Sequence, residues 1–337
     1  AKEALREVVV DWDVGEHGTL SSAAIMAHFK EGMQQTELAV ARNDGNTVDA
    51  LSKSAKVVEA DYFTPYLAHA TMEPMVCTAW LQGDQLEVWS STQNPEGTLA
   101  VSAATAGVPQ ANVKVHPVQL GGGLGRKSPQ DFTRQAVMIA KAMPGKPVKM
   151  LWSREEEIQH GLYRPASLMR FKAGLDANGK VDALHIRVSA PSILATLLRL
   201  PLPIGVDGQA VACFNDHPYA IPNTLVDYAQ RNTNVPVGFW RTVGHSQNPF
   251  GRECFIDECA LAAGKDPVEY RFAMLEGKTR FQNVLKLATE KAGYKKGAGK
   301  GNAFGVSIME GYDTYVAVVA EVSIGADGEV KVVKTTV

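Results

Sequence analysis

The feature of this sequence that most constrains its fold is a run of four glycines in five positions, residues 121–125 (GGGLG). Glycine loses more conformational entropy on folding than any other residue, so such a run is costly unless the backbone must pass close to something. Residues 113–120 alternate like a strand, and a helical pattern follows and ends at Pro144-Gly145. Ser128 and Pro129 suit the cap and the first position of that helix. The sequence therefore predicts a strand, a glycine loop and a helix.

A loop without side chains lets backbone N–H groups approach a ligand, and a helix N-terminus adds partial positive charge. We therefore expect an anionic, oxygen-rich ligand, with a tight chain crossing that binds nothing as the alternative. A dinucleotide fingerprint needs a different glycine spacing, with an acidic residue about 20 positions further on. A phosphate-binding P-loop needs Gly-Lys-Ser/Thr in order, whereas Arg126 follows Gly125 here. Nucleotide binding is thus a weaker hypothesis, and it predicts measurable affinity for ATP or NAD.

The composition is that of an ordinary globular protein, with 45% hydrophobic and 21% charged residues in 337. A formal net charge of -2 gives no basic field for nucleic acid. No apolar run approaches the roughly 20 residues of a membrane-spanning helix. None of the four cysteines forms a C-x-x-C pair, so we expect no metal held by side chains of this chain.

Turn and cap residues predict further elements. Hairpins are expected at residues 77–90, turning at Gly83-Asp84, and at 171–188, turning at Asn178-Gly179. Helices are expected over 21–33, 47–56, 254–263 and 281–292, with another beginning at Asp266-Pro267, and a last strand over 330–337. This mixture predicts an α+β fold with mixed sheets and helices.

Several segments, taken in order, resemble one known family. They are residues 69–74 (HATMEP), 89–93 (WSSTQ), 121–127 (GGGLGRK), 147–165 and 238–244 (GFWRTVG), followed by Asp257-Glu258, Asp266-Pro267 and Arg271. Together they resemble the molybdopterin-binding large subunit of the xanthine oxidase family, in its isoquinoline 1-oxidoreductase and bacterial aldehyde dehydrogenase branch. The resemblance implies two lobes. It divides the chain into a connecting segment (1–60), a first molybdopterin-binding lobe (61–250) and a helical segment that starts a second lobe (251–337).

The resemblance also implies roles for particular residues. Gln93 matches the glutamine that hydrogen-bonds an oxo ligand of molybdenum, although a loop glutamine is more often satisfied by backbone. The loop beside the cofactor is matched by Gly122, Gly123, Leu124, Gly125 and Arg126. Arg241 matches an arginine that helps hold the pterin, and the alternative for it is a surface ion pair.

Departures from the family pattern are informative. Leu124 replaces the usual phenylalanine of the loop. Ser128 and Val243 stand where purine hydroxylases carry a substrate-binding glutamate and phenylalanine, so we expect no purine substrate. Nothing matches the glutamate that acts as general base, and upstream cofactor segments are also missing. The chain therefore resembles a middle portion of the subunit.

The function implied is molybdenum-dependent hydroxylation of an aldehyde or N-heteroaromatic with oxygen from water. The implied cofactors are molybdopterin, in its cytosine dinucleotide form, and a [2Fe-2S] cluster on a partner. The implied partners are an iron–sulfur small subunit, further chains that complete the molybdenum subunit, and a cytochrome c subunit. The branch implies a periplasmic or membrane-associated location, with the cytoplasm as alternative. The second hypothesis is a non-catalytic or incomplete domain that acts in assembly.

Overall fold

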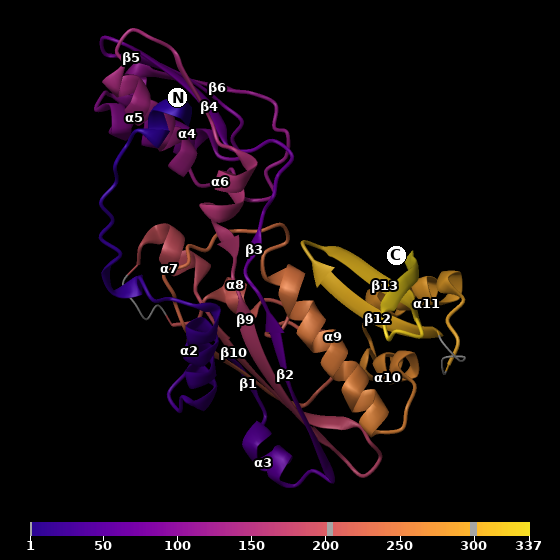
Figure 1. Ribbon diagram of the computed structural model, residues 1–337. Coiled ribbons are helices and arrows are strands. Elements are labelled where there is room, and N and C mark those ends of the chain that lie inside the picture. The colour runs from indigo at the N-terminus through magenta and orange to yellow at the C-terminus, as the bar shows by residue number, and fades with distance from the viewer. Residues whose placement is uncertain (1, 201–204, 297–301) are drawn as a thin grey trace.

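In the computed structural model, which describes residues 2–200, 205–296 and 302–337, mixed sheets and helices divide the chain into two lobes (Figure 1). The small lobe, residues 75–152, has a four-stranded sheet in the order β6-β5-β4-β7. Its elements are β4 (Val76–Gln82), β5 (Gln85–Ser90), α4 (Pro95–Ala106), η2 (Gln110–Asn112), β6 (Val113–Pro117), α5 (Asp131–Ala142) and β7 (Val148–Leu151). Phe132 and Val137 of α5 pack with Val88 and other buried residues of the sheet in a core of their own.

The large lobe is built on a five-stranded sheet in the order β1-β11-β10-β9-β2. Its strands are β1 (Ala39–Asp44), β2 (Lys56–Thr64), β9 (Ser167–Leu175), β10 (Val181–Ala190) and β11 (Asn223–Gln230). Its helices are α2 (Ser22–Gln34), α3 (Thr47–Ser52), α7 (Ile193–Leu198), α8 (Gly208–Val211), α9 (Gly244–Ala262) and α10 (Pro267–Met274). Phe171 of β9 packs against Phe214 and Phe255 in the core between this sheet and α9.

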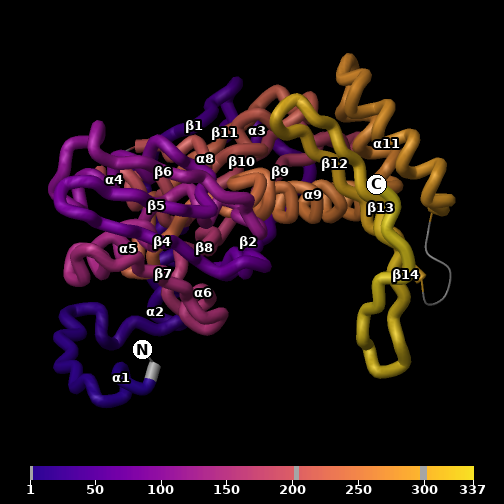
Figure 2. Tube along the Cα trace, turned by 90° about the horizontal axis from the view of Figure 1, so that it is seen from above, coloured from indigo at the N-terminus to yellow at the C-terminus, as the bar shows by residue number. Residues whose placement is uncertain are grey.

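The C-terminal part of the chain extends the large lobe. It consists of α11 (Thr279–Ala292) and a sheet of β12 (Asn302–Gly311), β13 (Thr314–Ile324) and β14 (Val330–Thr336). Figure 2 shows that this part lies at the far end of the molecule from α4 and α5. Shorter pieces are α1 (Lys2–Arg6), η1 (Gly15–His17), β3 (Leu67–Ala68), α6 (Arg154–Gln159) and β8 (Tyr163–Arg164).

Most local predictions are confirmed. Strands β4 and β5 form the hairpin at Gly83, and β9 and β10 form the second one at Gly179, both glycines having positive φ. The cap of α10 is Asp266, whose side chain accepts from the N–H groups of Val268 and Glu269. Helix α3 is shorter than expected, because Ala55 already donates to Leu175 at the start of the strand pairing.

Two helix starts were predicted wrongly. Ser128 and Pro129 do not begin α5, because the Ser128 N–H donates to the Gly125 carbonyl and extends the turn. The helix begins at Asp131, after Gln130. Helix α9 begins ten residues before the predicted segment and includes Pro249, the residue type that hides a helix from sequence analysis. The expected divisions after residues 60 and 250 fall within β2 and α9, and they stay a prediction.

Candidate cofactor-binding site

The predicted site residues come together because β5 and β6 run parallel, side by side, joined through α4. The carboxyl ends of parallel neighbours meet at one edge of a sheet, where ligands of α/β proteins commonly bind. Gln93 follows β5, and the glycine loop follows β6. The Gln93 N–H donates to the Lys127 carbonyl at 3.1 Å, so the two connections are joined directly.

The side-chain amide of Gln93 has a fixed orientation. Its Oε1 accepts from the N–H of Gly125 at 2.9 Å and from that of Lys127 at 3.3 Å. Only the oxygen of an amide accepts, so Nε2 must point the other way. Nε2 donates to none of the residues that the structure describes, and Gln93 is exposed. The sequence left open that Gln93 is simply satisfied by the backbone. This is true of its side-chain oxygen, but the side-chain NH₂ group has no such partner among the described residues.

Close packing explains three of the four glycines. A Cβ at Gly121 would lie 2.5 Å from the Glu73 Cβ, and one at Gly123 would lie 2.4 Å from the Gln93 Oε1. A Cβ at Gly125 would lie 2.0 Å from the Phe239 carbonyl oxygen. The tight chain crossing that the sequence left open is thus present. Gly122 differs, because only its φ of +101° requires glycine and the nearest atom is 3.7 Å from a Cβ there.

The middle of the loop retains unused donors. Among the described residues, nothing accepts a hydrogen bond from the N–H groups of Gly122, Gly123 or Leu124. Positive φ values at Gly122, Leu124 and Gly125 curl the backbone here. Successive N–H groups in such a curled backbone form a concavity that binds anions. The loop therefore combines packing on one side with open donors in its centre.

A second turn contacts the loop through Phe239. The His69 ring lies between two carbonyl groups, with Nε2 2.7 Å from that of Phe239 and Nδ1 2.9 Å from that of Leu162. Burial lowers the pKa of His69 more than these two carbonyls raise it. Two residues beyond Phe239, Arg241 is exposed and forms no ion pair within the described ranges. Its predicted alternative, a surface ion pair, is therefore not seen there.

Comparison with known proteins decides the family. A family model described as a molybdopterin cofactor-binding domain matches residues 29–274, well over half of the chain. The chain belongs to the molybdopterin cofactor-binding domain family. The predicted resemblance to molybdenum-binding subunits is confirmed at this level.

The chain matches only part of the length of the proteins that it is similar to. One subunit of the nicotinate dehydrogenase of Pseudomonas putida is 30% identical over 299 residues, covering 87% of this chain and 25% of that protein. The beta subunit of isoquinoline 1-oxidoreductase from Brevundimonas diminuta is 29% identical over 265 residues, covering 75% of this chain and 33% of that protein. The chain thus spans a quarter to a third of these relatives.

A solved structure shows the same fold. The aldehyde oxidoreductase from Desulfovibrio gigas superposes with a TM-score of 0.61 at 21% identity, covering 87% of this chain and 34% of that one. The predicted α+β class is confirmed by this likeness and by the mixed sheets. None of the helices in the described part of the chain is long and apolar enough to cross a membrane.

The donors at the loop suit the oxygen-rich group that gives the family its name. Nε2 of Gln93 and the N–H groups of Gly122, Gly123 and Leu124 are donors that lack an internal acceptor in the described residues. Oxygen atoms on a metal or a phosphate are strong acceptors for such groups. The residues present therefore fit such a group, in the sense that they offer donors of the kind that its oxygen atoms accept.

Arg126, also predicted at the cofactor, is committed elsewhere. Its side chain is 1% exposed, forms a two-fold pair with Asp131 at 2.8 and 2.6 Å, and lies over the Trp152 ring at 5.4 Å. Its neighbour Lys127, which the sequence analysis did not single out, is 0% exposed and reaches Glu73 and Ser91. No sequence signal distinguished the two, because both follow Gly125 and both are basic.

Glu73 is the carboxylate next to the loop, and it is already bound. Its Oε2 accepts from Lys127 Nζ and from the N–H of Gly121 at 3.1 Å. Burial raises the pKa of Glu73, but hydrogen bonds from Lys127, Gly121 and Ser91 bring it below its ordinary value. A carboxylate held this way is a poor general base at neutral pH.

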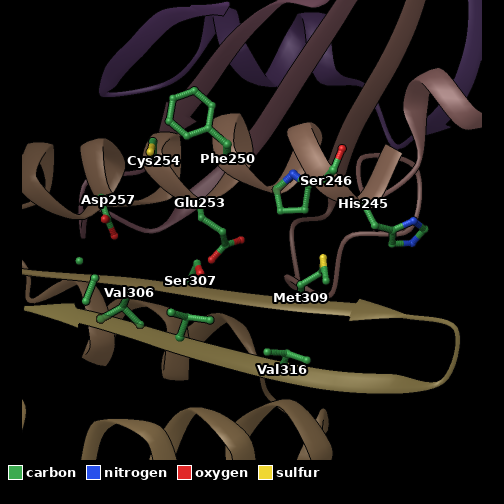
Figure 3. Close-up of a pocket in the computed structure, with 14 residues that line it drawn as sticks. His245, Ser246, Phe250, Glu253, Cys254, Asp257, Val306, Ser307, Met309 and Val316 are labelled. Carbon is green, nitrogen blue, oxygen red and sulfur yellow. The ribbon is translucent and has the colours of Figure 1, made fainter. Parts of the chain in front are cut away.

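A separate cavity lies away from the loop. It has a volume of about 440 Å³ and lies between α9 and the open face of β12 and β13 (Figure 3). Val316, Val318 and Ala320 line its strand side, and Phe250 and the half-buried Cys254 line its helix side. Its walls are mostly apolar, and none of the predicted cofactor residues lines it.

Proposed function

We propose that this chain is the part of a molybdenum hydroxylase subunit that holds the oxygen ligands of the molybdenum–pterin group. The observation that carries the proposal is the Gln93 amide, whose oxygen is fixed by two backbone N–H groups while its NH₂ group remains unused. A donor preorganised toward an oxygen that gains charge is an efficient electrostatic contribution to catalysis. The three open N–H groups of residues 122–124 lie in the neighbouring connection, which the Gln93 N–H joins at Lys127.

When bound, the cofactor supplies the oxidation of an electron-poor carbon with oxygen from water, and its electrons pass to an iron–sulfur partner. The residues of this chain bind and orient. Gln93 donates from Nε2, and the loop donates from Gly122, Gly123 and Leu124. Arg241 offers forked donors from the adjoining turn, suited to the pterin and its phosphate. Arg126 acts indirectly, by fixing Asp131 at the start of α5.

The substrate we propose is an aldehyde or an N-heteroaromatic. The relatives are named for nicotinate, isoquinoline and aldehyde. Ser128, at the position of a substrate-binding glutamate in purine hydroxylases, is half-buried and its backbone belongs to the loop turn. Val243 offers no aromatic face. A purine therefore lacks both its charged and its stacking partner here.

The finer assignments rest on the family resemblance. We propose the cytosine dinucleotide form of molybdopterin, and a [2Fe-2S] cluster on an iron–sulfur small subunit. Further chain segments supply the general-base glutamate, and a cytochrome c subunit takes the electrons. The division of the chain at residues 60 and 250 and a periplasmic or membrane-associated assembly belong to the same proposal.

The test removes the Nε2 donor of Gln93 and keeps the hydrogen bonds by which its side-chain oxygen holds the loop. Gln93→Glu is nearly isosteric, so its carboxylate still accepts from Gly125 and Lys127, but it presents an acceptor where Nε2 donates. In the complete assembly we expect retained molybdenum and pterin, measured by elemental analysis and pterin fluorescence, and kcat lower by about 10²–10³-fold. Gln85→Glu, on β5, is the matched control and leaves kcat unchanged.

Other outcomes decide between the hypotheses. A wild-type assembly with all partner subunits but without molybdenum or pterin favours the non-catalytic assembly domain. ATP or NAD binding at the loop, lost in Gln93→Glu, favours the nucleotide hypothesis. Full activity of Gln93→Glu contradicts the role assigned to this residue.

A further inference from the structure

The stretch of residues 121–127 is held at both ends by different partners. At its start, the Glu73 N–H donates to the Gly121 carbonyl at 2.9 Å, and the Gly121 N–H donates to the Glu73 carboxylate at 3.1 Å. At its end, the main chain and the amide oxygen of Gln93 bind the backbone of Lys127 and Gly125. The open N–H groups of residues 122–124 lie between these two anchors.

Lys127 connects the two anchors. Its backbone belongs to the Gln93 end, while its Nζ contacts the Glu73 carboxylate of the other end. The same Nζ donates to Ser91 Oγ at 3.1 Å, two residues before Gln93. With its side chain 0% exposed, this ammonium group has no access to water and depends on these partners.

The Glu73 segment is itself fixed from the other side. Arg154 donates to the carbonyl groups of Thr71 and Met72, and it pairs with the buried Glu157 at 2.6 Å. Thr71 Oγ1 in turn donates to the Glu73 carbonyl at 2.8 Å. The carboxylate that receives Lys127 therefore stands on a backbone with little freedom to follow a moving loop.

We infer that the Glu73–Lys127 ion pair positions the free N–H groups of residues 122–124 and the Gln93 amide for the group that binds there. These two are positioning residues, since the Lys127 ammonium is buried and the Glu73 carboxylate has no donor to offer a ligand. The inference rests on the proposed function for the nature of that group. The closure of the loop by the pair does not depend on it.

The two partners respond differently to removal. The Glu73 side chain is 30% exposed, so water can solvate it when Lys127 is lost. Lys127 is 0% exposed, so loss of Glu73 leaves a buried charge without a counter-charge. Lys127→Met therefore opens the loop while keeping the volume of the side chain, and Glu73→Gln also disturbs the fold. In the double variant Glu73→Gln/Lys127→Met the stranded charge is gone, so it should be more stable than Glu73→Gln alone.

The first experiment uses hydrogen exchange of the chain without cofactor. In Lys127→Met we expect the amides of Gly121, Gly125 and Lys127 to exchange about fivefold to tenfold faster, as loss of roughly one hydrogen bond predicts. Amides of β9 and β10 should not change. The matched control is Asp227→Asn, which breaks a buried carboxylate pair with Arg187 in the large lobe. It should lower Tm and leave the exchange of residues 121–127 unchanged.

The second readout is acid sensitivity. Lys127 is one of the groups that lower the pKa of Glu73 against burial. Without Lys127 that pKa rises. In Lys127→Met the protection of the Gly121 amide, taken relative to the exchange of an unstructured amide at the same pH, should therefore fall on mild acidification, at a pH where the wild type keeps its protection. A purely structural role of Lys127 moves Tm and produces no such pH dependence.

The loaded assembly completes the test. Lys127→Met should lose pterin faster on dilution than the wild type, with Asp227→Asn behaving like the wild type. Wild-type exchange at residues 121–127 in Lys127→Met, or additive effects in the double variant, overturns the inference. A wild-type assembly that holds no molybdopterin contradicts the proposed function instead, while the exchange results still judge the ion pair.

Discussion

Two carboxylates in this molecule, the buried Glu253 and the half-buried Glu73, have opposite relations to their neighbours. Glu253 on α9 is 3% exposed and accepts from Tyr219, Arg252, Arg271 and the N–H of Ile308. Arg252 then donates to the Ile308 carbonyl at 2.7 Å. This network joins α9, α10 and β12, and its carboxylate has partners on every side. Glu73 binds Gly121 and Lys127 of the glycine loop, and the N–H groups between these two residues stay unused.

This difference distinguishes a polar cluster that stabilises the fold from one that can bind a ligand. A polar cluster that satisfies itself fixes how helices and strands meet, and it has nothing left to offer a ligand. A held backbone with open N–H groups is the reverse, since it is ordered before anything binds. By this criterion the Glu253 network, although it borders the cavity of Figure 3, is structural, and the glycine loop is the region that we propose binds the cofactor.

The largest effect that can test this contrast is Glu253→Ala. Arg252 is left as a buried charge without a carboxylate partner, and Arg271 keeps only Asp257, so the free energy of unfolding should fall by about 3–5 kcal/mol. Urea denaturation followed by circular dichroism measures it. Exchange of residues 121–127 under native conditions should remain as in the wild type. A loss below about 1 kcal/mol would show that the network is solvated and dispensable.

Acid should weaken the large lobe through His217. Burial, with help from Arg42 and Arg252, lowers the pKa of His217 to about 3. The unfolded chain takes up a proton near the ordinary pKa of 6.5, while the folded chain does not. The contribution of neutral His217 to the free energy of unfolding is therefore fully present above pH 6.5. It declines as the pH falls from 6.5 toward 3, by roughly 1.4 kcal/mol per pH unit. Denaturation of His217→Asn between pH 6.5 and 5 should show a flatter slope, and an unchanged slope contradicts the assignment.

Two glycine substitutions sharpen the contrast within the loop itself. In Gly125→Ala the new Cβ meets the Phe239 carbonyl, so the second turn must move, at a cost of about 2–4 kcal/mol. In Gly122→Ala the space is open, and the left-handed backbone alone costs about 1–2 kcal/mol. Thermal denaturation of both variants compares them. A larger loss for Gly122 would mean that packing against Phe239 is not what holds the loop.

The smallest effect on stability is expected for Arg241→Ala. This exposed side chain supports nothing in the described fold, so the free energy of unfolding should change by less than about 0.5 kcal/mol. Retention of pterin in the assembly should nevertheless fall. Arg199→Ala removes the same charge from another exposed turn and serves as control. Equal pterin retention in both variants would remove Arg241 from the binding region.

Local rules predicted the elements that local contacts determine. The Asn178-Gly179 turn correctly predicted the hairpin of β9 and β10, and Asp266 as a cap correctly predicted the start of α10. The same rules misplaced the start of α5, because Gln130 is drawn into hydrogen bonds with Thr98 and Thr133 and the turn of the loop continues to Ser128. Ser128 therefore does not cap α5, because the hydrogen bond from Thr98 of α4 fixes Gln130 at the start of the helix instead.

Distant contacts also limit what the sequence reveals about the site. Gln93 and the glycine loop were predicted from motifs, and the structure joins them. Lys127 and Glu73 are 54 positions apart, and Phe239 reaches Gly125 from more than a hundred positions away. Which basic residue of the Arg126-Lys127 pair turns toward the loop depends on these partners. Neither side-chain pattern nor spacing contains that information.

The two anchors of the loop have a practical consequence for redesign. Because Glu73 fixes residue 121 and Gln93 fixes residues 125 and 127, the number of residues between them is set by the reach of two side chains. Inserting or deleting a single residue there would disconnect one anchor, however benign the added side chain. An engineer who wishes to reshape the loop should therefore keep the length of this connection and vary position 124, where the sequence has leucine in place of the phenylalanine expected from the family pattern.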